Sequence, residues 1–292
     1  MLANALLPSI RFCMKELFAP VASIAILCYA ADASGQGNQR NQLNQRGQAD
    51  LGSRASALQL PLPPNLLAAR EAKNPMEALA PFLGIAFRED GGIDEHGKYV
   101  LLGSPNKKFD APGLNCSGFV LAASRLLLKK NITLSAAVRD RLGDSGHGAA
   151  LGQDWDFGWD LLLNITEGEK RVLLLPGGLT SDPAAGSGLS PRGFDLHSPS
   201  TWQELPSRIR QNHLYLVSFN RPTWLQGYSF LHYHVGIFMR ASDQNWYLYH
   251  SVKKRGVVRE NLANEQGRAR FLESNANFGS ARKHMFIIEV PL

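Results

Sequence analysis

Residues with strand character fill the last third of this 292-residue chain, and one well-marked helical segment precedes them. Leu114–Lys129 has its apolar residues at helical spacing, and Asn115 stands where an N-cap is expected. Further along, β-branched and aromatic residues dominate four runs, at His213–Phe219, Leu231–Met239, Asn245–Val252 and Met285–Val290. The chain therefore passes from helices through a long middle segment into strands, and this order limits the folds open to it.

The middle segment, at about 130–205, separates the helix from the strands. It is rich in Gly and Pro but contains apolar patches at Trp159–Ile165 and Arg171–Leu175. A bare loop of this length is uncommon in a compact domain. We therefore interpret it as an insertion with structure of its own.

The first 33 residues resemble a signal peptide. A charged start at Met14–Glu16 is followed by the apolar run Leu17–Tyr29 and by a small-x-small site at Ala31–Ala33. Met14 is an alternative start of the chain. The apolar run is shorter than the roughly 20 residues of a membrane helix, so we expect no stable membrane span in the mature form, with an uncleaved anchor as the alternative. The pattern predicts export to the periplasm or the extracellular space.

A linker rich in Gln and Asn follows, at 34–59, and has few residues to bury. We predict that it is disordered. The Pro-rich stretch Leu60–Pro64 comes next, and Asn65–Ala80 has helical composition broken at Pro75. The folded domain should therefore span 60–292.

Composition and charge restrict the partners of this domain. The chain is 44% apolar and 19% charged, which supports a real core, and its net charge is +6. The predicted signal peptide has two basic and two acidic residues, so the mature chain keeps this charge. A basic exported protein is attracted to anionic polymers such as cell-wall material, whereas nucleic acid is a poor match. A solvated basic surface without a partner is the alternative.

Cys116 is the only cysteine left once the signal peptide is removed. A lone thiol in an oxidising compartment is a liability, which suggests that it is there to react. At the first turn of a helix, the macrodipole and unpaired amides favour the thiolate. Gly118 would allow substrate or backbone to approach closely, and the nearby amides could stabilise an oxyanion. We predict that Cys116 is a nucleophile.

Two strand histidines can complete a catalytic set. If Leu231–Met239 and Asn245–Val252 form a hairpin turning about Ser242, His234 lies directly opposite His250, with side chains about 5 Å apart. That arrangement suits His234 as base and His250 as its orienting partner. His232 should share a face with His234, and it is the alternative base if the register slips.

These residues resemble motifs of the NlpC/P60 family of papain-like cell-wall peptidases. Leu114–Val120 resembles the cysteine motif, His234–Ile237 the histidine motif, and His250 the third polar residue, while Gly84–Arg88 is similar to the segment that leads into the active site. The resemblance implies an α+β fold with a papain-like core, in which the nucleophile helix packs on an antiparallel sheet. It also implies hydrolysis of amide bonds in peptidoglycan stem peptides, without metal or cofactor.

The chain departs from the family pattern near the substrate. Phe87 stands where the family has a tyrosine, and Asn115 replaces an aspartate. We assign Phe87, Asn115 and Ser117 to the substrate side of the site. Asp154 and Trp155, in a run that mixes acids and aromatic residues, are candidates for a substrate groove.

Three other interpretations remain open. The histidines at 232, 234 and 250 with Cys116 or an acid could form a zinc site, although no spaced acidic ligand stands out and the Cys-Ser-Gly-Phe sequence is left unexplained. A catalytically silent relative would bind wall peptides or a partner protein through the same cleft. A thiol transferase would use the same three residues, because hydrolysis and transfer share the acyl-enzyme.

Overall fold

The computed structural model describes residues 60–141, 143, 156–181, 193–222, 230–277 and 281–292. All of them belong to one compact unit, Gln48–Leu292. The predicted signal peptide 1–33, the predicted linker 34–59 and both groove candidates, Asp154 and Trp155, lie outside the described residues. Within these ranges, no helix has both the length and the apolar character needed to cross a membrane.

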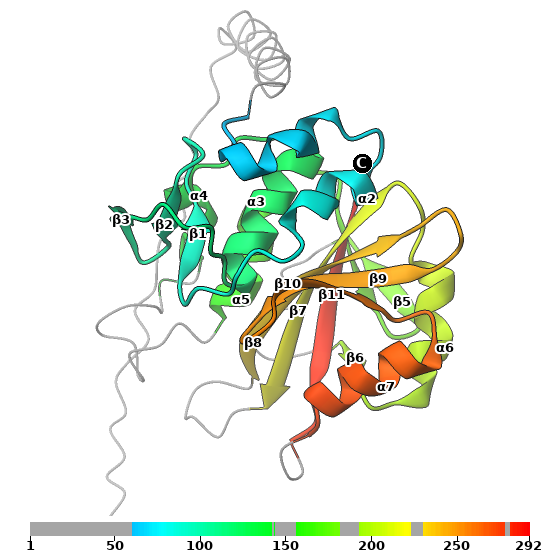
Figure 1. Cartoon of the computed structure of the whole chain (residues 1–292). Coiled ribbons are helices and arrows are strands. Elements are labelled where there is room, and N and C mark those ends of the chain that lie inside the picture. The colour runs from blue at the N-terminus through cyan, green and yellow to red at the C-terminus, as the bar shows by residue number, and fades with distance from the viewer. Residues whose placement is uncertain (1–59, 142, 144–155, 182–192, 223–229, 278–280) are drawn as a thin grey trace, which may run out of the picture. The chain divides into compact units, whose positions relative to one another are not determined.

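An antiparallel sheet forms the centre of the fold (Figure 1). Its strands follow the order β10-β9-β8-β7-β11-β4-β5, and β6 also pairs with β11. The four runs predicted from sequence correspond to β7, β8, β9 and β11. The strands are β4 Val172–Leu175, β5 Gly178–Thr180, β6 Phe194–Asp195, β7 His213–Pro222, β8 Phe230–Arg240, β9 Trp246–Val252, β10 Gly256–Asn261 and β11 His284–Pro291.

Helices cover both faces of this sheet. Neighbouring residues of β7 belong to different cores: Leu216 joins the cluster with α3 Cys116–Leu128 and α5 Phe157–Ile165, whereas Val217 joins the cluster with α6 Pro199–Arg208 and α7 Glu265–Ser274. Side chains alternate across a strand, so the two clusters lie on opposite faces. The fold is therefore α+β with a mostly antiparallel sheet, which confirms the predicted class.

Helix α3 is buried along most of its length because it lies between two sheets. It contacts β8 and β9 on one side and, on the other, β1 of a three-stranded antiparallel sheet. That small sheet consists of β1 Gly91–Ile93, β2 Tyr99–Leu101 and β3 Ser104–Lys108. Even Arg125 of α3 is buried, and its guanidinium donates to the carbonyl of Ile93 at 2.5 Å. The helix ends at Leu128, and its C-cap Lys129 has a left-handed φ of 51°.

The predicted helical stretch Asn65–Ala80 consists of three short pieces, η2 Pro64–Glu71, α2 Pro75–Leu79 and η3 Ala80–Phe82. Pro75 interrupts the stretch as expected, but it does so as the first residue of α2. Its fixed φ suits that position, and the missing amide would have no partner inside the helix. Asn74 caps the new helix by accepting from the Glu77 amide at 3.0 Å.

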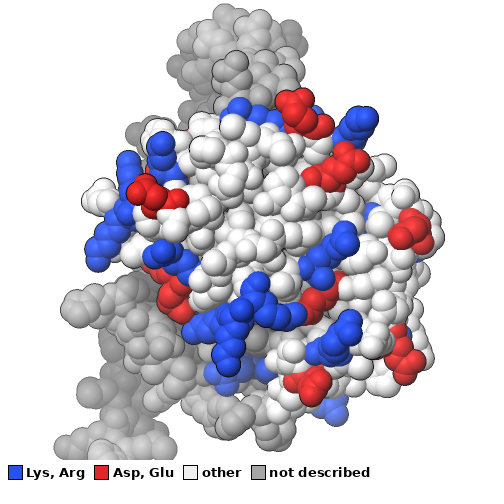
Figure 2. Space-filling model, viewed as in Figure 1, with Lys and Arg blue, Asp and Glu red and all other residues white. Residues whose placement is uncertain are grey.

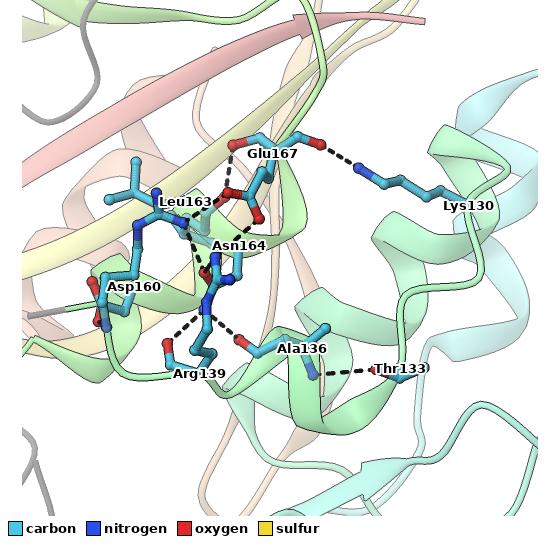
Figure 3. A network of polar contacts seen from close by, with 12 residues as sticks. Lys130, Thr133, Ala136, Arg139, Asp160, Leu163, Asn164 and Glu167 are labelled. Carbon is cyan, nitrogen blue, oxygen red and sulfur yellow. Dashed lines mark hydrogen bonds and ion pairs between the residues drawn. The ribbon is translucent and has the colours of Figure 1, made fainter. Parts of the chain in front are cut away.

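The described residues of the predicted insertion, at about 130–205, form part of the central fold. It contains α4 Leu134–Ala137 and α5, and its strand β4 pairs with β11. A polar network links the end of α4 to α5 (Figure 3). Asn164 donates to the carbonyl of Arg139 at 2.7 Å, and the guanidinium of Arg139 pairs with Glu167 at 3.0 Å. The segment therefore adds strands and core residues to the same sheet.

Candidate functional site

Cys116 is the first residue of α3, and contacts of the residues before it fix its position. The amide of Leu114 donates to the carbonyl of Ala86 at 3.0 Å. The hydroxyl of Ser251, on β9, donates to the carbonyl of Leu114 at 2.7 Å. Leu114, two residues before Cys116, is thus hydrogen-bonded both to the Gly84–Arg88 stretch and to the central sheet.

Asn115 and Gly118 set the first turn of α3. The Oδ1 atom of Asn115 accepts from the Gly118 amide at 2.7 Å, which confirms Asn115 as the N-cap. A Cβ on Gly118 would lie 2.0 Å from the carbonyl oxygen of Gly91 and 2.7 Å from the Cα of Gly92. Of the two roles expected for Gly118, the described contacts support close approach of the backbone.

His234 on β8 links Cys116 to His250 on β9. The charge and hydrogen bonding of His234 lower the pKa of the Cys116 thiol, and the Nε2 atom of His234 lies 2.9 Å from the Nδ1 atom of His250. The two imidazole centroids are 5.1 Å apart, and the His234 ring stacks on Phe219 at 5.6 Å. The fold therefore brings together the three residues expected to carry the chemistry.

The hairpin register between β8 and β9 differs from the predicted one by two residues. Ile237 pairs with Tyr249, so the same register places Gly236, and not His234, opposite His250. A Cβ on Gly236 would lie 3.4 Å from the Cβ of His250. A shift of two residues keeps every side chain on its face, so His234 becomes a diagonal neighbour of His250 and still reaches it.

The surroundings of Cys116 favour its thiolate. Burial raises the pKa of Cys116, but the charge and hydrogen bond of His234 outweigh it. With the Val235 amide and the Ser117 hydroxyl, they bring this pKa from 9.0 down to about 7. The Oγ atom of Ser117 lies 3.9 Å from the sulfur. Near neutral pH a large fraction of Cys116 is therefore in the nucleophilic form.

Glu260 extends this chain of contacts, and the sequence reasoning missed it. Its Oε2 atom lies 3.5 Å from Nε2 of His250, and its Oε1 atom accepts from the Arg255 guanidinium at 2.7 Å. Burial raises the pKa of Glu260, but His250 and Arg255 hold it at about 2. Burial lowers the pKa of His250 to about 4. At neutral pH a charged carboxylate therefore faces a neutral imidazole.

Glu260 was missed because β10 was not predicted. Val258 of β10 pairs with His250, and Glu260, two residues further on, is the diagonal neighbour on the same face. A signal was present: the β-branched pair Val257-Val258 follows Gly256, which has a φ of 69°. Gly before two β-branched residues, directly after a strand, is typical of a hairpin.

A β-bulge in β8 separates His232 from His234. Phe219 of β7 pairs with His234, but the next residue, Asn220, pairs with His232, so Tyr233 is an extra residue in β8. Such a residue breaks the alternation of side chains along a strand. The expectation that His232 and His234 share a face is therefore wrong.

His232 lies in a different core from His234. Its ring stacks on Trp159 with centroids 5.9 Å apart, and its Nδ1 atom lies 2.8 Å from the hydroxyl of Ser218. Trp159 belongs to the cluster with α3 and α5, whereas Phe219, which stacks on His234, belongs to the opposite cluster. Burial lowers the pKa of His232 to about 3, so it stays neutral. These contacts place His232 as a core residue.

Among the described residues, no group of three or more His, Cys, Asp or Glu side chains is placed to hold a metal ion. The zinc arrangement considered from the sequence needs His232, His234 and His250 on one face. The bulge turns His232 away from His234 and His250, so the three histidines do not converge on one point.

The predicted substrate residues lie in two settings. Phe87 forms a parallel bridge with Leu114, and the ammonium of Lys253 lies 5.9 Å from the centroid of its ring. Phe87 is therefore close to the start of α3. Ser117 is buried beside Cys116, and the side-chain oxygen of Asn115 is engaged in the cap.

Basic side chains surround the turn between β9 and β10, next to His250 and Glu260. Lys253 is 74% exposed and pairs with Glu89 at 3.1 Å, and Arg255 is 52% exposed. Figure 2 shows a group of Lys and Arg side chains in the lower part of the face that Figure 1 presents. Exposed cations, among them Lys253 and Arg255, therefore lie on the surface next to His250 and Glu260.

No protein-family model, no curated protein and no solved structure matches this chain.

Proposed function

We propose that this protein is a cysteine hydrolase that cleaves amide bonds through an acyl-enzyme. The observation that carries the proposal is the chain of contacts from Cys116 to His234 and on to His250 at 2.9 Å, at the start of a buried helix. A nucleophile, a base and an orienting partner within hydrogen-bond reach are what acyl transfer requires.

In the proposed reaction, the thiol proton of Cys116 moves to His234 and the thiolate attacks the amide carbonyl. The amide of Cys116, at the helix start, donates to the oxyanion that forms. The imidazolium of His234 then gives its proton to the leaving amine, and a thioester remains on Cys116. Water attacks the thioester after His234 takes one of its protons, which releases the acid and restores the thiol.

We propose peptidoglycan stem peptides, or another peptide amide, as the substrate, and a divergent NlpC/P60 relationship with a papain-like core. The support is the resemblance around Cys116, His234 and His250, together with a cysteine helix packed on an antiparallel sheet. Export to the periplasm or outside the cell belongs to the same proposal. The exposed cations near the site suit an anionic wall polymer.

The first experiment measures the rate of Cys116 alkylation by iodoacetamide between pH 5 and 10, in the wild type and in His234→Ala. With a pKa of about 7, half of the thiol is ionised at pH 7, against about 1% at the ordinary value of 9.0. The variant should therefore react roughly 50-fold more slowly at pH 7. Labelling is read by mass spectrometry at the peptide that contains Cys116, and Cys116→Ser is the control for that peptide. Equal profiles in wild type and variant would refute the Cys–His pair.

The second experiment tests the reaction. Purified peptidoglycan is incubated with the wild type or with Cys116→Ser, and new amino groups and released peptides are measured by mass spectrometry. Amide cleavage by the wild type alone supports the hydrolase. A reactive thiol without cleavage of wall or model peptides would refute the hydrolase and favour a binding protein on the same fold.

A further inference from the structure

We propose that Glu260, held by Arg255, sets the proton positions on His250 and His234, and so presents an unprotonated Nδ1 atom of His234 to Cys116. The inference rests on the proposed role of His234 as base. Glu260 and Arg255 are positioning residues, because they act on Cys116 only through the two histidines.

The carboxylate of Glu260 faces the imidazole of His250. An ionised carboxylate can only accept hydrogen bonds, so the proton of a neutral His250 belongs on Nε2, the atom that faces Glu260 at 3.5 Å. Only 4% of the His250 side chain and 14% of the Glu260 side chain are exposed. Solvent therefore screens this interaction weakly, and the proton has a strong preference for that nitrogen.

The preference is passed on to His234. With its proton on Nε2, neutral His250 has a lone pair on Nδ1, which must accept from Nε2 of His234 across 2.9 Å. Neutral His234 then has its proton on Nε2 and a lone pair on Nδ1. Nδ1 is the remaining ring nitrogen, and it can accept the thiol proton of Cys116.

The opposite polarity would block the proposed reaction. If His250 had its proton on Nδ1, it would donate to Nε2 of His234 and force the His234 proton onto Nδ1. That nitrogen could no longer accept a proton from Cys116. The same two rings and the same 2.9 Å contact allow both polarities, and the carboxylate of Glu260 decides between them.

Arg255 fixes the carboxylate that makes this choice. It lies in the turn between β9 and β10, and its guanidinium donates to Oε1 of Glu260 at 2.7 Å. The other oxygen, Oε2, is thereby directed at His250. A charge-assisted hydrogen bond of this length gives the carboxylate a defined orientation.

The tautomers can be read directly by ¹⁵N NMR of the full chain labelled at histidine. At pH 7.5 we expect both His250 and His234 to carry their proton on Nε2. A neutral His234 with its proton on Nδ1 and none on Nε2 would overturn the inference. This measurement needs no variant and no turnover. Correct tautomers in a protein that cleaves no amide would end the hydrolase proposal alone, and reversed tautomers in an active hydrolase would end this inference alone.

Glu260→Gln tests the cause. Its expected effects are a mixture of tautomers at His250 and His234 and an upward shift of about one unit in the alkylation pKa of Cys116, or about tenfold slower labelling at pH 6. Glu260→Asp retains the charge and should recover part of both signals. Glu89→Gln is the matched control, because it removes an exposed acid paired with Lys253 at 3.1 Å. Wild-type tautomers and labelling in Glu260→Gln would refute the role of Glu260.

Discussion

Replacing Gly118 by alanine should both destabilise the protein and disturb the thiol. The new Cβ would lie 2.0 Å from the carbonyl oxygen of Gly91 and 2.7 Å from the Cα of Gly92. Both are backbone atoms, so no side chain can rotate away. Either α3 or β1 must move, although the Asn115 amide donates to the same Gly91 carbonyl at 2.9 Å.

The size of the effect follows from two opposing terms. Overpacking a well-packed core costs about 1 to 3 kcal/mol, and a contact of 2.0 Å with backbone belongs at the upper end. Alanine gains up to about 1 kcal/mol over glycine inside a helix, and less in its first turn. The net loss for Gly118→Ala is therefore about 2 kcal/mol, or roughly 4 to 8 °C in Tm for a domain of this size.

The same shift should reach Cys116, two residues earlier on α3. Moving the first turn away from Gly91 of β1 presses α3 toward β8 and disturbs the alignment of Cys116 with His234, so alkylation at pH 7 should slow while the thiol stays accessible. Thermal unfolding by circular dichroism and labelling by mass spectrometry measure the two effects.

Gly178→Ala is the control for the glycine substitution itself. A Cβ at Gly178 meets no atom within 4 Å, so its Tm should stay within about 1 °C of the wild type. An unchanged Tm together with wild-type labelling in Gly118→Ala would show that close approach to Gly91 does not position the nucleophile.

Two further predictions concern the cap and the buried histidine. Asn115→Ala should lower the free energy of unfolding by about 1 kcal/mol and slow labelling of Cys116. Asn264→Ala removes the equivalent 2.7 Å cap of α7, so it should lower stability by a similar amount and leave labelling unchanged. Slower labelling in both variants would contradict a local effect of the Asn115 cap. Burial lowers the pKa of His232 to about 3, below about 6.5 in the unfolded chain, so the unfolded state binds the extra proton between these values and stability falls as the pH falls. Urea unfolding at pH 7 and pH 5 should show a loss about 2 kcal/mol smaller in His232→Gln than in the wild type, and equal losses would contradict it.

Local patterns in the sequence were enough to find the cysteine helix and four strands of the central sheet. The cap at Asn115 and the helix after it are signalled within a few residues, because capping and helical spacing depend on near neighbours. The strands β7, β8, β9 and β11 were found for the same reason. Their alternating and β-branched residues reflect burial, which acts along each strand separately.

The sequence also indicated which residues meet, but not how they meet. Cys116, His234 and His250 were selected from their immediate neighbours, and they lie together in the structure. Their alignment was predicted with a register two residues off. The expected contact survived because side chains repeat every two residues along a strand.

By itself, then, the sequence determined the α+β class, the capped cysteine helix and the strands that carry the two histidines. Only the tertiary structure decided the bulge at Tyr233, which turns His232 into a different core, and the pairing of β10, which brings Glu260 to His250. The physical reason is the distance in sequence over which each feature is determined. Helical spacing and caps depend on residues within about one turn of each other. Bulges and registers are chosen by packing between strands distant in the chain, and no local pattern records that choice.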